Sequence, residues 1–190
     1  MSRSAVLVSL AFAAALALTG CTPTTPGGGP SGSSTSGGTS TPSASSTPAT
    51  ATFTLPADCT AIASAATLTT LFADIPSRAP ADLTRPAPAS STKKLTCSWF
   101  AGDTTGGDVI YYSTTAAAGQ AYLSVMQANG FTCTAALGGT RCDKTTPNTQ
   151  YPVDTVETTF TRDNVWIYIS MTNVDATALL PDMVATAWAA

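Results

Sequence analysis

Residues 22–52 have a composition that is not expected to fold, so a folded domain is expected only in the part of the chain that follows them. This stretch consists of Ser, Thr, Gly, Pro and Ala, without a charged residue or an apolar period. Such a segment cannot bury enough surface to offset the entropy lost on ordering. We therefore predict a disordered linker, with a reach on the order of 30 Å, and a single domain over residues 53–190. The Ser/Thr clusters beside proline leave open whether this stalk is O-glycosylated or an unmodified spacer.

The first 20 residues predict an export signal that is removed. Arg3 supplies a positive start, and the apolar run over residues 5–18 has the length of a secretory signal core and is short for a membrane span. The run ends in Leu-Thr-Gly-Cys at positions 18–21, which resembles the lipobox of bacterial lipoproteins. We expect Cys21 to carry diacylglycerol, and often a further acyl chain, and to anchor the protein at the extracytoplasmic face of the cell membrane. An ordinary secretory signal is the alternative.

The charge balance gives no support to a nucleic-acid-binding role. The chain has 8 Lys and Arg against 11 Asp and Glu, a net charge of −3, and loss of Arg3 with the signal makes the mature chain more negative. A basic surface that would attract nucleic acid is therefore not expected. No run after Cys21 approaches the ~18 apolar residues of a membrane-spanning helix. The expected partners are the membrane, through the lipid on Cys21, and an envelope protein or small ligand, with the chain as a monomer.

Four cysteines remain after Cys21, and an even number in an exported protein favours two disulfides. They are Cys59, Cys97, Cys133 and Cys142. Residues 131–136 and 140–144 flank Gly138 and Gly139, a tight-turn signal, and a hairpin there would place Cys133 opposite Cys142. That pairing leaves Cys59 for Cys97, although three connectivities are possible. The alternative, a zinc site, lacks any His and any Cys-x2-Cys pair.

The pattern over residues 53–190 predicts an α+β fold. Helices are expected at about 60–74, capped by Asp58, at 116–129, capped by Thr115, and from beyond Asp175 through Trp188. Strands are expected at 95–100, 108–114, 131–136, 140–144, 155–161 and 165–171. The order helix, hairpin, helix, hairpin, hairpin, helix predicts an antiparallel sheet of about six strands with helices packed on one face. The Pro-rich residues 76–92 are predicted to form an irregular loop.

A family resemblance rests on two cysteine positions. Cys59 ahead of an amphipathic helix and Cys97-Ser98-Trp99 in a strand, behind a lipobox and a Ser/Thr/Pro stalk, resemble the actinobacterial lipoproteins of DUF3558, a family of unknown function. The resemblance covers residues 57–129. It implies that Cys97 bonds to a cysteine near the start of the mature domain, and that the protein lies in the cell envelope of a high-GC Gram-positive organism. No established chemistry comes with it.

The absence of histidine excludes a Ser-His-Asp triad, a His metal site and a His general base. Lys93 and Lys94 lie near three serines in the sequence, which leaves a Ser–Lys pair as one interpretation. These serines are Ser90, Ser91 and Ser98. A solvated lysine pair that discourages association of the sheet edge is the favoured interpretation.

Two carboxylate pairs give only weak candidates for chemistry. Asp103 and Asp108 flank a Gly-containing turn, where turn formation is favoured over a weak calcium loop. Asp154 and Glu157 are expected at different places relative to the sheet, which does not provide the facing carboxylates of a glycosidase. We therefore expect no catalytic residue, no metal ligand and no cofactor.

Aromatic side chains supply the remaining candidate site. Trp166 and Tyr168 share one face of a predicted strand, Tyr112 is expected beside them, and the β-branched residues of that strand take the opposite, core-facing side. We predict an open strip of Trp166, Tyr168 and Tyr112 that binds a ligand by stacking. The alternative is that helices or the Pro-rich loop cover this strip. Trp99 and Trp188 are assigned to the core.

The function predicted from these features is a lipid-anchored, non-enzymatic ligand-binding or sensor module of the cell envelope. The alternative is an accessory subunit that binds another envelope protein through the aromatic strip. An enzyme is the third and least favoured hypothesis.

Overall fold

The computed structural model describes residues 51–80 and 83–189. The predicted signal peptide, the predicted lipidation site Cys21 and the predicted linker up to residue 50 lie outside the described residues. The predicted domain over 53–190 falls almost entirely within them.

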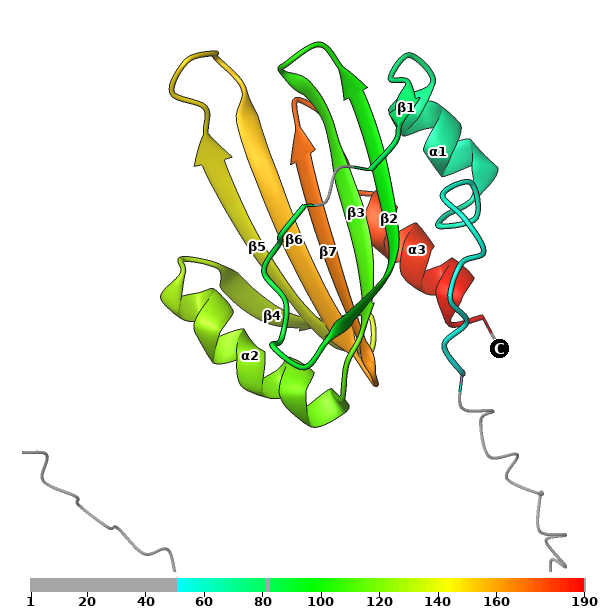
Figure 1. Ribbon diagram of the computed structural model, residues 1–190, viewed down its shortest axis with the longest axis vertical. Helices are drawn as coiled ribbons and strands as arrows, with labels where there is room; N and C mark the ends of the chain where they lie inside the picture. The colour runs from blue at the N-terminus through cyan, green and yellow to red at the C-terminus, as the bar shows by residue number, and fades with distance from the viewer. Residues whose placement is uncertain (1–50, 81–82, 190) are drawn as a thin grey trace, which may run out of the picture. The chain divides into compact units, whose positions relative to one another are not determined.

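A seven-stranded antiparallel sheet forms the centre of the domain, in the order β1-β2-β3-β7-β6-β5-β4 (Figure 1). The strands are β1 Ser77–Arg78, β2 Thr92–Ala101, β3 Thr105–Ser113, β4 Thr132–Ala136, β5 Gly139–Pro147, β6 Asp154–Arg162 and β7 Val165–Thr172. The α+β class is confirmed. The additional strand lies in the Pro-rich segment predicted as a loop, where Ser77 pairs with Trp99 and Arg78 with Ser98.

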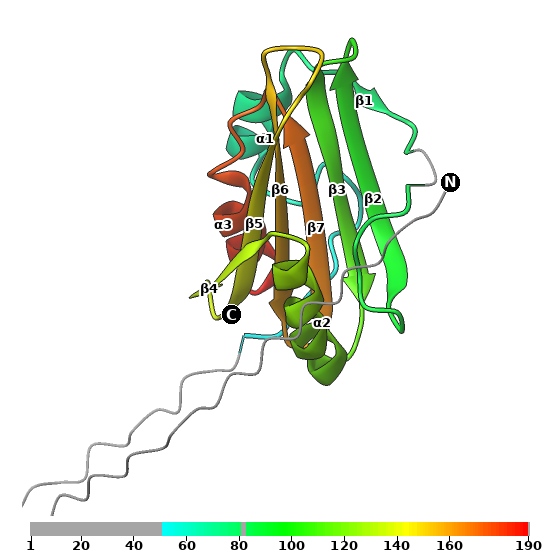
Figure 2. The same ribbon diagram turned by 90° about the vertical axis from the view of Figure 1, so that its left-hand side faces the viewer.

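Three helices cover both faces of this sheet, so the prediction that helices pack on one face is wrong. They are α1 Ala65–Phe72, α2 Ala116–Ala128 and α3 Leu179–Ala187. Figure 2 shows α1 and α3 on one side and α2 on the other. The central strands are apolar on both sides: Tyr111 and Ile167 face α3, whereas Ile110 and Tyr168 face α2, all fully buried. Two apolar faces each need a cover, because exposed apolar surface is costly in water.

Helix α1 begins later than predicted, and Asp58 is not its N-cap. The Asp58 carboxylate accepts hydrogen bonds from Thr60 N–H (2.8 Å) and Thr60 Oγ1 (2.6 Å), which form a local turn ahead of the helix. Ser64 is the cap and accepts from Thr67 N–H. Ile62, between turn and cap, is fully buried, so the segment before α1 contributes to the core without being helical.

The other predicted elements are close to those observed. Thr115 caps α2, as predicted, and accepts a hydrogen bond from Ala118 N–H at 3.1 Å. The hairpin between β4 and β5 turns at Leu137 and Gly138, which both have positive φ, one residue before the predicted centre. A two-residue turn of this type requires positive φ at both central positions.

Both predicted disulfides are present. Cys59–Cys97 joins the segment before α1 to β2, with a Cα–Cα distance of 5.5 Å. Cys133–Cys142 joins directly opposed residues of β4 and β5, with a Cα–Cα distance of 3.9 Å. Trp99 and Trp188 lie in the core as predicted.

Candidate functional site

The predicted aromatic strip exists, but it is covered. Trp166 and Tyr168 are 0% exposed and Tyr112 is 7% exposed, so the prediction of an open strip is wrong. The ring of Tyr122 from α2 packs edge-on against Trp166, with centroids 5.5 Å apart. From the Pro-rich segment, the Pro86 carbonyl accepts a hydrogen bond from Trp166 Nε1 at 3.0 Å. Helix α2 and the Pro-rich loop together therefore bury the strip. This is the alternative prediction, that helices or the Pro-rich loop cover it.

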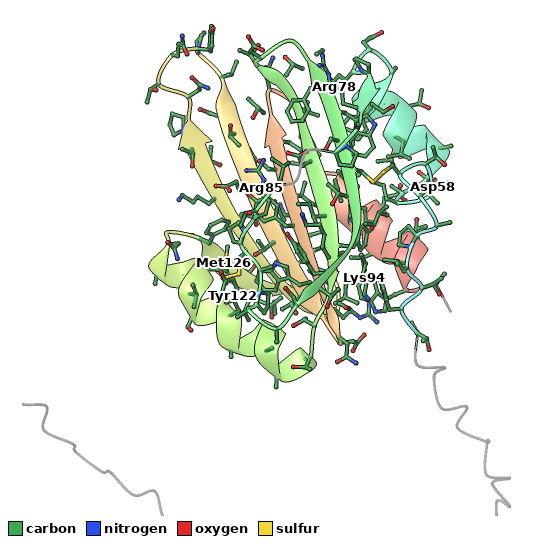
Figure 3. The ribbon with its side chains drawn as sticks, in the orientation of Figure 1. Asp58, Arg78, Arg85, Lys94, Tyr122 and Met126 are labelled. Carbon is green, nitrogen blue, oxygen red and sulfur yellow. A yellow bond between two sulfur atoms is a disulfide. The ribbon has the colours of Figure 1, made fainter. Side chains whose placement is uncertain are left out.

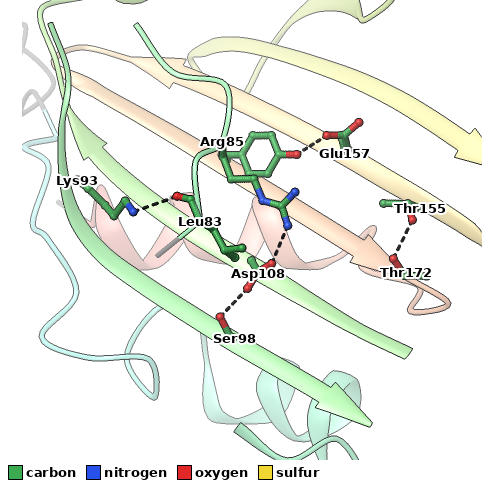
Figure 4. Close-up of polar contacts among 9 residues, drawn as sticks. Leu83, Arg85, Lys93, Ser98, Asp108, Thr155, Glu157 and Thr172 are labelled. Atoms are coloured by element: carbon green, nitrogen blue, oxygen red, sulfur yellow. Dashed lines mark hydrogen bonds and ion pairs between the residues drawn. The ribbon is translucent and has the colours of Figure 1, made fainter. Parts of the chain in front are cut away.

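Arg85 fixes this loop to the sheet through a buried carboxylate (Figure 4). Its Nη2 donates to Asp108 Oδ2 at 2.9 Å, and its guanidinium carbon lies 5.6 Å from the centroid of Tyr168. Ser98 Oγ donates to the other Asp108 oxygen at 2.5 Å. Asp108 is only 1% exposed, and its burial is tolerated because the charge is paired and hydrogen-bonded. Arg85, Ser98 and Asp108, together with Phe100, line a pocket of about 240 Å³.

A row of polar side chains crosses five strands at the level of Asp108. In register, it consists of Ser98, Asp108, Ser170, Glu157 and Lys144. The Tyr168 hydroxyl donates to Glu157 in this row. Burial raises the pKa of Tyr168, and the hydrogen bond to Glu157 raises it further, so the phenol stays protonated at neutral pH. The row lies next to Tyr168 on the α2-facing side of the sheet.

Two of the three serines considered for a Ser–Lys pair, Ser91 and Ser98, have other partners. Ser98 Oγ donates to Asp108, and Ser91 Oγ donates to the Pro88 carbonyl at 2.6 Å. Neither hydroxyl therefore directs its proton to a lysine amine. Lys93 Nζ donates to the Leu83 carbonyl at 3.0 Å.

The two carboxylate pairs are not brought together. Asp108 lies inside β3, opposite Ser98, whereas Asp103 lies in the turn before that strand. Asp154 and Glu157 are three residues apart in β6 and so lie on opposite faces of the sheet. Within residues 51–80 and 83–189, no group of three or more His, Cys, Asp or Glu side chains is placed to hold a metal ion. The helices of this part of the chain are too short or too polar to cross a membrane.

A largely apolar cavity of about 490 Å³ lies at one end of the sheet. Phe53 and Leu55 line it from the start of the domain, Lys94 from β2, and Tyr112 and Val165 from β3 and β7. Figure 3 shows Lys94 toward the opposite end of β2 from Arg78. Of the three predicted ligand-binding residues, Tyr112 alone lines this cavity. Burial raises the pKa of Tyr112 despite the opposing charge of Arg85, so its hydroxyl is neutral at pH 7.

The segment that begins the domain is held against α3 and forms one wall. Thr54 N–H donates to the Ala187 carbonyl at 2.8 Å. The ring centroid of Phe53 lies 4.8 Å from that of Trp188. This wall is therefore fixed by both a backbone hydrogen bond and an aromatic contact.

The turn between β6 and β7 forms the opposite rim. Asp163 accepts a hydrogen bond from Trp188 Nε1 at 2.9 Å. The Asn164 carbonyl accepts from Thr114 N–H at 2.9 Å, and Asn164 Oδ1 accepts from Ala116 N–H at 3.1 Å, at the start of α2. Asp163 and Asn164 both line the cavity, so its rim is tied to two helices.

Sequence reasoning missed Phe53, Leu55 and Lys94 as site residues. The available signal was that Phe53 and Leu55 are the first large apolar side chains after the linker. A two-residue apolar pattern at a domain boundary does not specify what it packs against.

No family model matches the chain, and no match was found among curated proteins or solved structures. The resemblance to DUF3558 therefore stays a prediction, and the site has to be interpreted from its own geometry.

Proposed function

We propose that the protein is a membrane-anchored extracytoplasmic lipoprotein whose domain is a non-enzymatic binding module, and that the cavity beside Tyr112 takes the apolar part of a small ligand. The anchor rests on the lipobox-like sequence ending in Cys21. The observation that carries the binding role is the cavity itself, about 490 Å³ with a mainly apolar lining. Ligand sites in proteins are typically concave, apolar and roughly 300–1,000 Å³ in volume.

The cavity walls favour binding because they are held in place without a ligand. Tyr112 and Val165 belong to the two central strands, which pair with each other along their length. Phe53 packs on Trp188, and the Trp188 indole holds Asp163 at the rim. A preformed site loses little conformational entropy when a ligand enters, which favours affinity.

The polar groups at the rim are suited to orienting a ligand. Asp163 Oδ2 accepts from the Trp188 indole and lies 3.6 Å from Arg162 Nε, and these contacts hold the carboxylate in place. The buried phenol of Tyr112 is a neutral hydrogen-bond donor or acceptor suited to orienting a ligand.

The test is binding of a neutral apolar fluorophore, N-phenyl-1-naphthylamine, to the full mature chain with Cys21→Ser. This substitution removes the acyl chains that would compete for the probe. We expect saturable, one-to-one binding. Leu55 and Leu137 provide a matched pair, since they are 41% and 38% exposed and only Leu55 lines the cavity.

We expect Leu55→Asp to weaken probe binding about ten-fold, because a charge replaces apolar contact with the ligand. Leu137→Asp should leave the affinity within about two-fold. Equal effects of the two substitutions, or no saturable binding, would overturn the proposal. A chain that binds no probe but retains a co-purifying envelope protein would support the accessory-subunit alternative instead.

A further inference from the structure

Lys94 reaches the cavity because β2 contains a bulge. In the register between β2 and β3, Lys93 pairs with Tyr112 and Leu95 with Tyr111, so Lys94 is an extra residue without an opposite partner. A bulge interrupts strict side-chain alternation and redirects the extra side chain. The two neighbouring lysines consequently have different surroundings: Lys93 Nζ donates to the Leu83 carbonyl, whereas Lys94 lines the cavity.

The rim of the cavity carries one positive charge without a counter-charge. Lys94 and Asp163 are the two ionisable side chains of opposite sign that line it. Asp163 is engaged by Trp188 Nε1 and Arg162. For Lys94 Nζ, residues 51–80 and 83–189 provide neither a hydrogen bond nor an ion pair. An exposed amine at the mouth of an apolar cavity favours a ligand that is apolar at one end and anionic at the other.

The stalk of this chain is poorly suited to fill the cavity. Residues 22–50 contain only Ser, Thr, Gly, Pro and Ala, with no acidic side chain for Lys94 and no large apolar side chain for the wall around Phe53. A separate molecule that carries both a hydrocarbon part and an anionic group can contact the apolar wall and pair with the Lys94 amine.

We propose that the cavity binds a single-chain anionic amphiphile, with the hydrocarbon chain against Phe53, Tyr112 and Val165 and a carboxylate or phosphate head at Lys94. This inference rests on the proposed binding function and specifies its ligand class. A volume of about 490 Å³ lies toward the lower end of the range for small-molecule sites, which favours one chain over the two chains of a membrane phospholipid.

The test is displacement of N-phenyl-1-naphthylamine from the full mature Cys21→Ser chain at pH 7 and low salt. Dodecanoate, dodecyl phosphate and dodecanol carry the same chain with different heads, and each is used below its micelle-forming or solubility limit. We expect the two anions to displace the probe at about five-fold lower concentration than the alcohol, the size of a favourable exposed ion pair. Salt at 0.5 M should reduce this difference, because it screens the charge.

Substitution at Lys94 separates the charge from the hydrocarbon contact. Lys94→Gln should abolish the preference for the anions, and Lys94→Glu should reverse it, each judged against the affinity of the same variant for the probe. Lys93→Gln removes an equal charge one residue away and should retain the preference.

The possible failures are distinguishable. If the probe binds but dodecanol competes as well as dodecanoate, the anionic ligand class is wrong and the binding function stands. The same conclusion follows if Lys93→Gln and Lys94→Gln have equal effects. If the probe does not bind at all, the proposed binding function is wrong, and the ligand class that rests on it falls with it.

Discussion

At the scale of single residues, Asp108 shows how a charge can be built into the interior of a sheet. It is 1% exposed, with Arg85 on one carboxylate oxygen and Ser98 on the other. The ion pair also positions the Pro-rich loop over the aromatic side chains of β7. Removing one member of a buried pair costs more than the pair contributes, because the remaining charge stays buried.

We therefore expect Arg85→Met to lower the free energy of unfolding by about 2–3 kcal/mol, less than for a fully buried pair because the Arg85 side chain is 29% exposed. The double substitution Arg85→Met with Asp108→Asn should cost less than the sum of the single substitutions. Urea unfolding in a double-mutant cycle measures the difference. Arg78→Met, at an exposed arginine nearby, is the control and should cost below about 1 kcal/mol. Additivity within about 0.5 kcal/mol would contradict coupling of the pair.

A second residue-scale prediction concerns Asp182, which connects α3 to the cap of α1. Its Oδ2 accepts from Ser64 N–H at 2.7 Å, and hydrogen bonding from Ser64 lowers the pKa of Asp182. A carboxyl pKa that is lower in the folded than in the unfolded chain stabilises the fold above the unfolded value of about 3.9. This contribution is lost as the pH falls through the folded pKa.

Asp182→Asn should therefore lower the free energy of unfolding at pH 7 by less than about 1 kcal/mol, since the site is exposed. The difference from the wild-type chain should shrink toward pH 2, as measured by urea unfolding at a series of pH values. A difference that is the same at pH 7 and pH 2 would mean that the carboxylate charge is not responsible.

At the scale of helices and strands, the two disulfides close loops of different length. Cys59 and Cys97 are separated by 38 positions, and Cys133 and Cys142 by 9. In the chain-entropy description, a longer closed loop restricts the unfolded chain more. The first bond also holds a non-helical segment, including the buried Ile62, against the core.

We expect paired Cys59→Ala and Cys97→Ala substitutions to cost about 4 kcal/mol, and paired Cys133→Ala and Cys142→Ala substitutions about 2.5 kcal/mol. Guanidinium unfolding of each double variant gives the two values. The reverse order would show that local packing of the hairpin outweighs loop entropy.

The sequence predicted elements best where the signal was local. Thr115 as the cap of α2 and the hairpin holding Cys133 and Cys142 were predicted correctly, because each depends on a few neighbouring residues. The cap of α1 was misplaced at Asp58, which forms a local turn with Thr60 instead. The short strand β1 was missed, since its two residues pair with residues of β2 that lie 22 and 20 positions further along the chain. The covering of both sheet faces was also missed, because alternating Ile and Tyr side chains such as Ile110 and Tyr111 do not indicate which face stays open.

At the scale of the whole molecule, the proposed lipid anchor at Cys21 precedes the cavity along the chain. The described domain begins at residue 51, and Phe53 and Leu55 already line the cavity. In the proposed arrangement, the stalk presents this cavity to the space outside the membrane.

Cys21→Ser should move the full chain from the membrane fraction to the soluble fraction, because durable attachment needs two or more acyl chains. Fractionation followed by immunoblotting measures this, with Thr22→Ala as the control that should stay membrane-bound. Far-ultraviolet circular dichroism should be unchanged, since Cys21 lies outside the domain. Retention of the Cys21→Ser chain on membranes would contradict the lipid anchor.

The candidate site was only partly predictable at this scale. Tyr112 was predicted as a ligand contact from its aromatic character, and it lines the cavity. Trp166 and Tyr168, predicted to act with it, are fully buried and do not line the cavity. The cavity depends on packing between the start of the domain, the end of α3 and a bulge at Lys94. None of these is a local sequence pattern, so the site could not be located before the fold was known.

The strand order has a consequence for how fast the chain folds. Strand pairs β2–β3, β4–β5, β5–β6 and β6–β7 each join neighbours along the chain, whereas β3 and β7 meet across α2 and two hairpins. The pairing of Ser113 with Val165 closes a loop of about fifty residues. The conformational entropy of this loop must be lost before the contacts between β3 and β7 are gained. We expect the two halves of the sheet to form early and the β3–β7 contact to limit the refolding rate.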